Sequence, residues 1–158
     1  MVSIEKLSDA HIESVLKITL AEEQMKFAGA AEEFLADGND TTHLHVIKSY
    51  DEVVGFFKID ITYAFTHEFC ADNGIALRTF VIDVNHQGKG IGTASVKALF
   101  SYLKANYSAY NSIYLTVNCL NRAAQACYQK GGFEITGEKY LGGEAGPQHI
   151  MRGKINGP

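Results

Sequence analysis

The chain has 158 residues, of which 46% are hydrophobic and 20% charged, and its formal net charge is −4. This length suits a single domain over residues 1–158 with one buried core, and the composition excludes a disordered or collagen-like chain. The acidic balance disfavours a dedicated nucleic-acid binder, because such a protein needs a basic surface to neutralise phosphates.

Neither the apolar runs nor the cysteines indicate a membrane or an oxidising compartment. Apolar runs such as residues 53–57 are far shorter than the ~18 residues of a membrane span, and the N-terminus lacks the apolar segment of a signal peptide. The three cysteines are an odd number without paired metal-ligand spacing, which argues against a disulfide framework and a zinc site. We therefore expect a cytoplasmic protein with reduced thiols, no membrane span and no bound metal.

The first part of the chain favours two helices followed by two strands. Residues 8–20 place apolar side chains at helical spacing after a plausible N-cap at Ser8. Residues 23–36 continue with a second helix that ends at a polar cluster containing glycine. Residues 43–49 and 53–62 are β-rich and are separated by a short polar turn, which predicts an antiparallel hairpin.

The second part of the chain alternates strands and helices. The expected order is a strand at 76–84, a helix at 90–107, a strand at 112–118, a helix at 121–130, and strands at 133–140 and 148–154. No repeat or linker interrupts this order, so we place no domain boundary. Grouped strands followed by β-α alternation predict an α/β fold, with a mixed sheet and helices on both faces.

The loop between the strand at 76–84 and the helix at 90–107 is rich in glycine. Gly88, Gly90 and Gly92 stand at alternate positions. Glycine lets a ligand approach the backbone closely, and the free N–H groups at a helix start bind phosphate oxygens. Such turns also occur as plain tight connections, but here the loop predicts a cradle for an anion.

Two common phosphate-binding motifs do not fit this loop. A P-loop would need Ser or Thr after Gly-Lys, whereas Gly88-Lys89 is followed by Gly90. A dinucleotide-binding fold would need an acidic residue at the end of the next strand, which here ends at Asn118. Both ATP hydrolysis and a nicotinamide cofactor are therefore disfavoured.

A third phosphate-binding pattern fits the glycine loop. The signature Gln/Arg-x-x-Gly-x-Gly/Ala of the GNAT N-acetyltransferase family, which binds acetyl-CoA, resembles the loop at Gln87, Gly90 and Gly92. Downstream, the family's second motif, Asn-x-x-Ala-x-x-x-Tyr-x-x-x-Gly-Phe, is matched by Asn121, Ala124, Tyr128, Gly132 and Phe133. The resemblance covers residues 76–135. It implies transfer of an acetyl group from acetyl-CoA to a primary amine, on a mostly antiparallel sheet of six or seven strands with two splayed parallel strands and about four flanking helices.

By this resemblance, acetyl-CoA would bind along the third strand and the glycine loop. The backbones of Phe80, Val81 and Ile82 would pair with the pantetheine arm as if it were an added strand. Asn121 would hydrogen-bond the cofactor, and Ala124 is small enough to let it pass. Backbone N–H groups from Gly88 onward would hold the pyrophosphate, and the loop residues assigned to the cofactor are Gln87, Gly88, Lys89, Gly90, Ile91, Gly92 and Thr93.

Tyr128 is the candidate catalytic residue. Amine acetylation needs a proton for the departing thiolate, and Tyr128 lies one turn after Ala124 on the same helix face. A tyrosine at this spacing could equally fill the core with its hydroxyl satisfied locally. The surrounding motif favours the role of general acid.

The general base is not defined by the sequence. Several family members carry a Glu in the strand before the loop, whereas Ala76 and Arg78 stand at the matching positions here. Asp83 is the only acidic residue of that strand, but an Asp at a strand end more often orients a turn. A water chain could instead end on one of four carboxylates, Glu22, Glu23, Glu68 or Asp72.

Three further reactive residues have plainer interpretations. His43 and His45 share one face of a strand, as two metal ligands might, but no carboxylate or cysteine spacing accompanies them. Two ordinary strand histidines are the better interpretation. Cys127, next to Tyr128, is expected to be a buried, inert thiol rather than a nucleophile.

The acceptor amine is less defined than the cofactor. Residues 77–83 with 87–90, residues 133–138, and Gln24 with Phe27 are similar to the branch of the family that acetylates polyamines and diamines. An aminoglycoside, an amino acid or a protein N-terminus would fit the same cofactor half. The alternative from another class is a domain that binds acetyl-CoA as a sensor with little turnover. Family members are often dimers, so a homodimer is one option, although no apolar stripe marks its interface.

Overall fold

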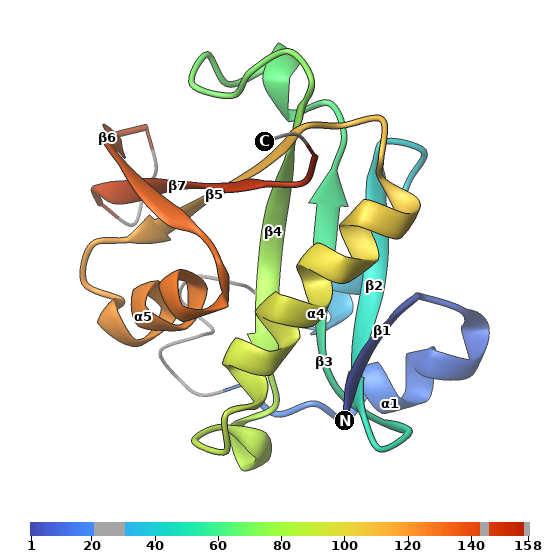
Figure 1. Ribbon diagram of the computed structural model, residues 1–158. Coiled ribbons are helices and arrows are strands. Elements are labelled where there is room, and N and C mark those ends of the chain that lie inside the picture. Colours follow the sequence, from blue (N-terminus) through green and yellow to red (C-terminus); the bar gives the residue numbers. More distant parts are fainter. Residues whose placement is uncertain (21–30, 143–145, 157–158) are drawn as a thin grey trace.

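One mixed β-sheet organises the protein. The computed structural model describes residues 1–20, 31–142 and 146–156 (Figure 1). Within these ranges seven strands form one sheet in the order β1-β2-β3-β4-β5-β7-β6, and only β4 and β5 are parallel neighbours. The strands are β1 Val2–Lys6, β2 Thr42–Ser49, β3 Glu52–Asp60, β4 Gly74–Ile82, β5 Ser112–Asn118, β6 Glu134–Tyr140 and β7 Gln148–Lys154.

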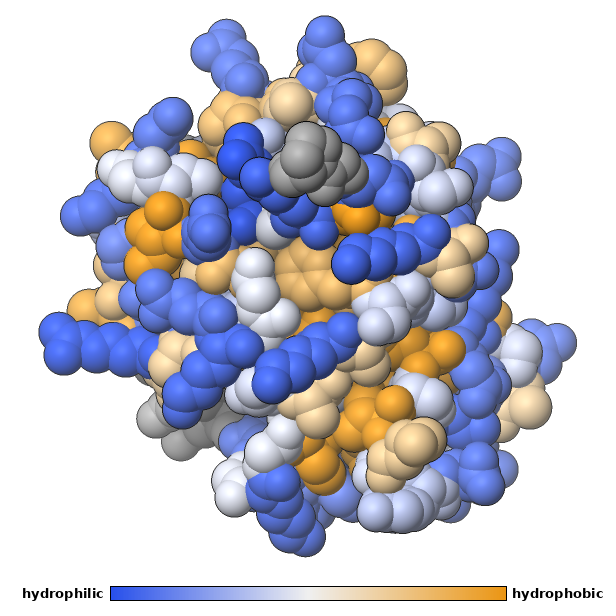
Figure 2. Space-filling view, viewed as in Figure 1, coloured by the Kyte–Doolittle hydropathy of each residue, from blue (hydrophilic) through white to orange (hydrophobic). Residues whose placement is uncertain are grey.

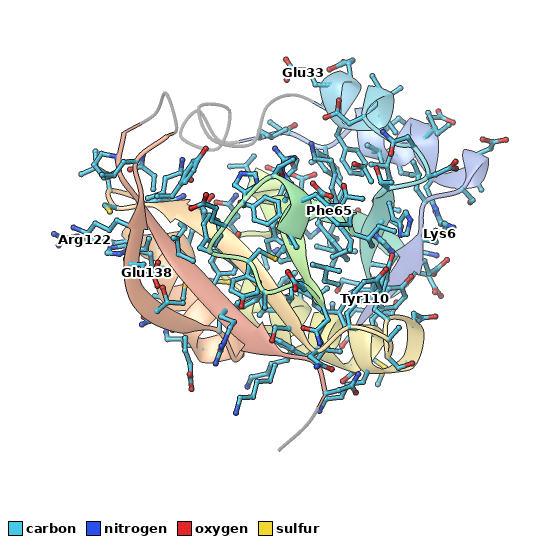
Figure 3. The ribbon with its side chains drawn as sticks, turned by 90° about the horizontal axis from the view of Figure 1, so that it is seen from above. Lys6, Glu33, Phe65, Tyr110, Arg122 and Glu138 are labelled. Atoms are coloured by element: carbon cyan, nitrogen blue, oxygen red, sulfur yellow. The ribbon has the colours of Figure 1, made fainter. Side chains whose placement is uncertain are left out.

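Helices cover both faces of this sheet. Figure 1 shows α4 and α5 in front of it, and Figure 3, seen from above, shows α4 on one side and α1 with α3 on the other. No described helix is both long and apolar enough to span a membrane. The described helices are α1 Ile12–Leu16, α3 Ala31–Ala36, α4 Ile91–Asn106 and α5 Arg122–Gly131, with 3-10 turns η1 Asp9–His11, η2 Tyr63–Phe65 and η3 Val84–His86.

The alternation of side chains along β4 separates the two faces. Ile75 and Leu77 pack in the main core with Leu99 of α4. Ala76, which lies between them, packs on the opposite face, because successive strand residues point to opposite sides. That opposite face holds two smaller buried clusters, one with Val15, Phe34, Val46, Phe56 and Val81, and the other with Tyr63, Cys70, Ala76, Tyr114 and Ile150.

The predicted hairpin is confirmed as β2 and β3. Its turn holds Tyr50 and Asp51 at φ values of 49° and 68°, the left-handed backbone that a two-residue type I′ turn needs at both positions. β1 extends the hairpin by pairing antiparallel with β2. This half of the sheet therefore consists of a local hairpin and one strand that pairs with it from a distant part of the chain.

The predicted splaying of the parallel strands is also confirmed. β4 and β5 pair only at their first residues, the last pair being Ala76 with Tyr114. From Leu77 and Leu115 onward the two strands have no register pair, although β4 stays paired with β3 and β5 with β7. A gap therefore opens between two strands whose outer edges remain fixed in the sheet.

The N-terminal prediction was wrong in its first element. Residues Val2–Lys6 form a strand, so two helices do not precede the sheet. This strand has only two inward apolar side chains, Val2 and Ile4, and its alternation is too short to stand out in the sequence.

The first helix is shorter than predicted. Only η1 and α1 are helical within residues 8–20, because the chain leaves the helix at Lys17. The carbonyl of Thr19 then accepts the N–H of Val84, which ties this segment to the end of β4. Of the second predicted helix, α3 confirms the last part, and Glu22, Glu23, Gln24 and Phe27 lie outside the described residues.

The remaining elements of the second half form where the sequence predicts them. β5 and β7 have the predicted bounds, whereas β4 begins and ends two residues earlier than expected. Val84 belongs to η3 rather than to the strand. Gly90 and Asn121, predicted as first helical residues, are the N-caps of α4 and α5.

His45 is a fully buried polar residue beside the main core. Its ring stacks on Phe57 with centroids 4.9 Å apart and meets Tyr102 edge-on at 5.2 Å. Its Nδ1 donates to the carbonyl of His43 at 3.2 Å, while its Nε2 has no partner among the described residues. Burial lowers the pKa of His45 to about 4, because a charged imidazolium would lose its hydration here.

This burial predicts a pH-dependent stability. A histidine in the unfolded chain has a pKa of about 6.5, so below that pH the unfolded state binds a proton that the folded state resists. The stabilisation is complete above pH 6.5 and falls by up to about 3 kcal/mol as the pH drops to 4. His45→Phe keeps the stacked ring and should remove this component of the pH dependence. Urea denaturation of both proteins at several pH values measures the free energy of unfolding. If this free energy depends on pH equally in both proteins, His45 is not the source of the pH dependence.

Candidate active site

The glycine loop has the backbone that its sequence predicts. Gly88 and Gly90 both have φ of 78°, a left-handed conformation that side chains with a Cβ rarely adopt. A Cβ built on either glycine would meet no atom within 4 Å, so the space over the loop is open. Asp83, at the start of the loop, accepts the N–H of Asn85 at 3.0 Å and fixes the turn. This local role leaves no support for Asp83 as a general base.

The N–H groups at the start of α4 are available to a ligand. The first hydrogen bond into the helix is donated by the N–H of Ala94 to the carbonyl of Gly90 at 3.0 Å. Among the described residues, the N–H groups from Gly88 to Thr93 donate to no other protein atom. A helix of 16 residues follows, and its dipole favours negative charge at this end.

Gly92 serves a different purpose from the two glycines before it. A Cβ at Gly92 would lie 3.0 Å from Sγ of Cys127, so this glycine allows α4 and α5 to pack closely. Burial raises the pKa of the Cys127 thiol, while a hydrogen bond with Thr93 acts in the opposite direction. Cys127 is therefore a half-buried, protonated thiol, where the sequence predicted a buried one, and its lack of reactivity stays a prediction.

Gln87 links the loop to β4. Its Nε2 donates to the carbonyl of Ile82 at 3.0 Å. The carbonyl of Val81 faces Gly55 on β3, and the N–H of Asp83 donates to Val54, so the backbone of Ile82 between them points to the open side. Gln87 of the loop therefore occupies the outward carbonyl of Ile82, whereas the N–H of Ile82 points toward the gap.

A bulge in β4 determines which face of the sheet the side chains before and after it occupy. Thr79 has φ of 52°, and the register with β3 shifts between Phe56 and Lys58. Because of the extra residue, Leu77 and Phe80 face α4, whereas Arg78 and Val81 occupy the other face. A left-handed threonine costs of order 1 kcal/mol or more, a strain that concentrates at functional sites.

The second motif forms the other wall of the gap. Asn121 caps α5, since its Oδ1 accepts the N–H of Ala124 at 3.3 Å. Gln125 Nε2 donates to the carbonyls of Asn118 and Cys119 at 3.0 and 3.2 Å, which fixes the end of β5 to the helix. The cap explains Asn121 without a ligand, so its contact with the cofactor stays a prediction.

Tyr128 connects the two walls. Its ring meets Phe80 of β4 and Phe133 edge-on, each with centroids 5.7 Å apart. Its hydroxyl has no hydrogen-bond partner among the described residues. Burial of the ring raises the pKa of Tyr128 far above that of a free tyrosine, so the group carries its proton at neutral pH.

The ring nitrogens of the two strand histidines are not placed to bind a metal. His43 Nε2 donates to the carbonyl of Asp40 at 2.9 Å, so its Nδ1 accepts the hydroxyl of Tyr107 at 2.6 Å. Both nitrogens of His43 are occupied, and His45 is enclosed in aromatic rings. They are ordinary strand histidines, as expected.

A shallow hollow of about 510 Å³ lies beside the loop. It is lined by β1, the β2–β3 turn and the start of α4, including Gly90 and Ile91. On the face seen in Figure 1, Figure 2 shows apolar side chains at the centre and in the lower part, surrounded by mainly hydrophilic ones. No described residue of β5 or α5 lines the hollow, so it lies outside the gap in which Tyr128 stands.

One carboxylate near the gap was not among the residues predicted from the sequence. Asp60, at the end of β3, pairs with Ala76 of β4 and has a side chain only 12% exposed. Two charged residues at alternate positions of an apolar strand, Lys58 and Asp60, were the available signal. The exposed Glu68 and Asp72 lie in the loop before β4, and their proposed link to the amine through water stays a prediction.

Known proteins share this architecture. Residues 9–133 match the model of the Acetyltransferase (GNAT) family. The chain is 28% identical over 148 residues to the spermine/spermidine N(1)-acetyltransferase of Bacillus subtilis (strain 168), covering 90% of this chain and 94% of that protein.

Solved structures of low sequence identity share the fold. An aminoglycoside acetyltransferase in complex with coenzyme A superimposes with a TM-score of 0.79 at 18% identity, covering 98% of this chain and 95% of that one. A spermidine N-acetyltransferase from Vibrio cholerae in complex with CoA and spermine gives 0.71 at 16% identity, with coverage of 98% and 95%.

The splayed strands, the glycine loop and the matched family model define an acyltransferase that uses acetyl-CoA to acetylate an amine. The chain belongs to the GNAT acetyltransferase family. The family predicted from the two motifs is therefore confirmed. The individual residues assigned to the cofactor stay predictions, from Phe80 in β4 to Ala124 in α5.

The loop geometry predicts the effect of a substitution at Gly90. Gly90→Val adds a β-branched side chain at a φ of 78° and places it in the open space over the N–H groups. We expect acetyl-CoA affinity to fall at least tenfold, since the pyrophosphate loses its access. Isothermal titration calorimetry with acetyl-CoA measures the change.

Gly137→Val is the matched control for this substitution. Gly137 in β6 also has a positive φ, 90°, and open space around it, so it carries a similar backbone strain away from the loop. Unchanged affinity in Gly90→Val, or an equal loss in both variants, would contradict the cradle.

Proposed function

We propose that the protein transfers the acetyl group of acetyl-CoA to a primary amine of a small polyamine or diamine, with Tyr128 as the general acid. The gap between β4 and β5 carries this proposal, because it opens at the end where the glycine loop begins and Tyr128 of α5 contacts Phe80 of β4 beside it. The family membership supplies the reaction, and the geometry suggests the residues that perform it.

The described residues fit acetyl-CoA. The N–H groups from Gly88 to Thr93 suit a pyrophosphate, since they are free and lie at the positive end of a helix dipole. The outward N–H of Ile82 suits an amide oxygen of an extended arm. Phe80 and Val81 would continue this edge toward the bulge at Thr79, so the thioester would arrive next to Tyr128.

The proposed chemistry is a direct transfer. The neutral amine nitrogen attacks the thioester carbonyl carbon, a C–N bond forms, and the C–S bond breaks. The sulfur leaves as a thiolate and takes the hydroxyl proton of Tyr128. The proton lost by the amine nitrogen passes through water and restores Tyr128, so the net products are an amide and a free thiol.

The acceptor class rests on relatives. The Bacillus subtilis relative is named for spermine and spermidine, and it aligns along almost the whole of this chain. The Vibrio cholerae structure contains spermine and shares the fold. These similarities support a linear amine with several amino groups as the acceptor.

Tyr128→Phe tests the general acid. The variant keeps the ring contacts with Phe80 and Phe133 and removes only the proton donor. We expect acetyl-CoA affinity to change little and kcat to fall by about 100- to 10,000-fold, the usual contribution of general acid catalysis. The release of free thiol with spermidine as acceptor measures kcat, and calorimetry measures affinity on the same preparation.

Tyr110→Phe is the control, because it removes a hydroxyl from a tyrosine packed beside α4 in the loop before β5. It should leave kcat unchanged. A kcat in Tyr128→Phe equal to that of the wild-type enzyme would defeat the role of general acid. It would then leave Tyr128 as a packing residue whose lost interactions cost about 1 kcal/mol of stability at most.

A further inference from the structure

Charged and aromatic side chains gather on the sheet face opposite α4, at the closed end of the gap. Ala76 of β4 and Tyr114 of β5 form the last pair before these two strands separate. Asp60 of β3 pairs with Ala76 on its other side, so it lies one strand away from the closed end. Neighbouring strands are about 4.8 Å apart. The carboxylate of Asp60 therefore lies near the point from which the gap opens.

Asp60 keeps capacity for a further donor. Its Oδ1 accepts the N–H and the hydroxyl of Thr62 at 2.9 and 3.0 Å. Among the described residues, its Oδ2 faces only Nη1 of Arg78, at 3.5 Å, which is longer than a good charge-assisted hydrogen bond. Arg78 is half-exposed and can move aside. Lys58, the other nearby cation, is already held by Asp37 at 2.8 Å.

An aromatic cluster adjoins this carboxylate, formed by Tyr63, His67, Phe69, Tyr114 and Tyr140. Tyr63 and His67 stack at 3.8 Å, and the other rings meet at 5.5 to 6.2 Å in edge-on or tilted pairs. Tyr63 is buried, and its hydroxyl interacts electrostatically with Arg78 and Asp60.

Asp60 and Asp72 make the electrostatic potential negative next to this cluster. Burial is the main cause that raises the pKa of the Cys70 thiol to about 11, and the two carboxylates act in the same direction. Aromatic ring faces and a carboxylate are the groups that bind ammonium ions. This end of the site therefore has the chemistry of a cation subsite.

We propose that Asp60, with the aromatic cluster beside it, binds an ammonium group of the acceptor while a second amino group of the same molecule reacts next to Tyr128. The inference rests on the proposed amine acetylation and deepens it, because it makes two amino groups the requirement for a good substrate.

The spacing along β4 supports this requirement. Phe80, which touches Tyr128, stands four residues beyond Ala76, so the two points are at most about 13 Å apart at 3.3 Å per residue, because the bulge at Thr79 shortens the strand. A short monoamine cannot occupy both. A linear amine of this length with amino groups along it can.

Arg78 competes with the acceptor for the same oxygen. In the free protein its guanidinium faces Oδ2 of Asp60, and an arriving ammonium must displace it. Asp60 and Arg78 are therefore expected to act on acceptor binding in opposite directions. A pair that only stabilised the fold would not show opposite effects.

The experiment compares spermidine with hexylamine, a monoamine, as acceptors for thiol release from acetyl-CoA. The wild-type enzyme should prefer spermidine. Asp60→Asn keeps the acceptor for Thr62 and removes the charge, so KM for spermidine should rise about 10- to 100-fold, the range of one charge-assisted hydrogen bond. The KM values for hexylamine and acetyl-CoA should stay unchanged. Arg78→Gln should lower KM for spermidine.

Asp51→Asn is the control, because it removes one negative charge from an exposed turn at the other end of β3. Asp51→Asn should leave KM for spermidine and KM for hexylamine unchanged. If Asp60→Asn raises KM equally for both amines, or raises neither KM, the inference is overturned. If Asp60→Asn does not fold, an unchanged or higher KM for spermidine in Arg78→Gln would overturn it. A wild-type enzyme that releases no thiol with any amine would instead refute the proposed function.

Discussion

The short pairing between β4 and β5 is the constraint on which the rest of the site depends. Beyond Ala76 and Tyr114 the facing backbone groups of the two strands have no strand partner, although buried N–H and carbonyl groups are normally paired. The sheet tolerates this because β3 and β7 hold the outer edges of the two strands. The unpaired edge of β4 leaves hydrogen-bonding groups available to an extended ligand, and Tyr128 of α5 contacts this strand through Phe80.

Two local devices adapt β4 to this opening. The bulge at Thr79 turns the strand, so that Phe80 faces α5 and Arg78 faces the opposite side. The loop after the strand uses left-handed glycines to present its N–H groups, and Gln87 ties it back to Ile82. The strand therefore offers an apolar wall to one side of the gap and charged side chains to the other, and the described glycine N–H groups of the loop at its end have no protein partner.

The two faces of the sheet accordingly differ in chemistry. The face toward α4 is a continuous apolar core into which His45 fits only as a neutral ring. On the other face, the ion pairs of Lys58 and Asp60 lie between the apolar cluster under α1 and α3 and the aromatic cluster near Tyr114. The proposed sites of the cofactor and of a cationic acceptor thus lie on different faces of the sheet.

The sequence by itself determined the family, the strand and helix order after residue 40, and the glycine loop. It could do so because these depend on local properties: alternation of apolar residues, glycine at left-handed positions and the spacing of side chains along one helix. It did not reveal β1, whose two apolar residues gain meaning only against β2 and α4. Nor did it reveal Asp60, because a carboxylate in a strand becomes notable only when strand pairing places it beside Ala76 at the closed end of the gap. Pairing between distant segments decided these features, since no local pattern encodes which strands become neighbours or where they separate.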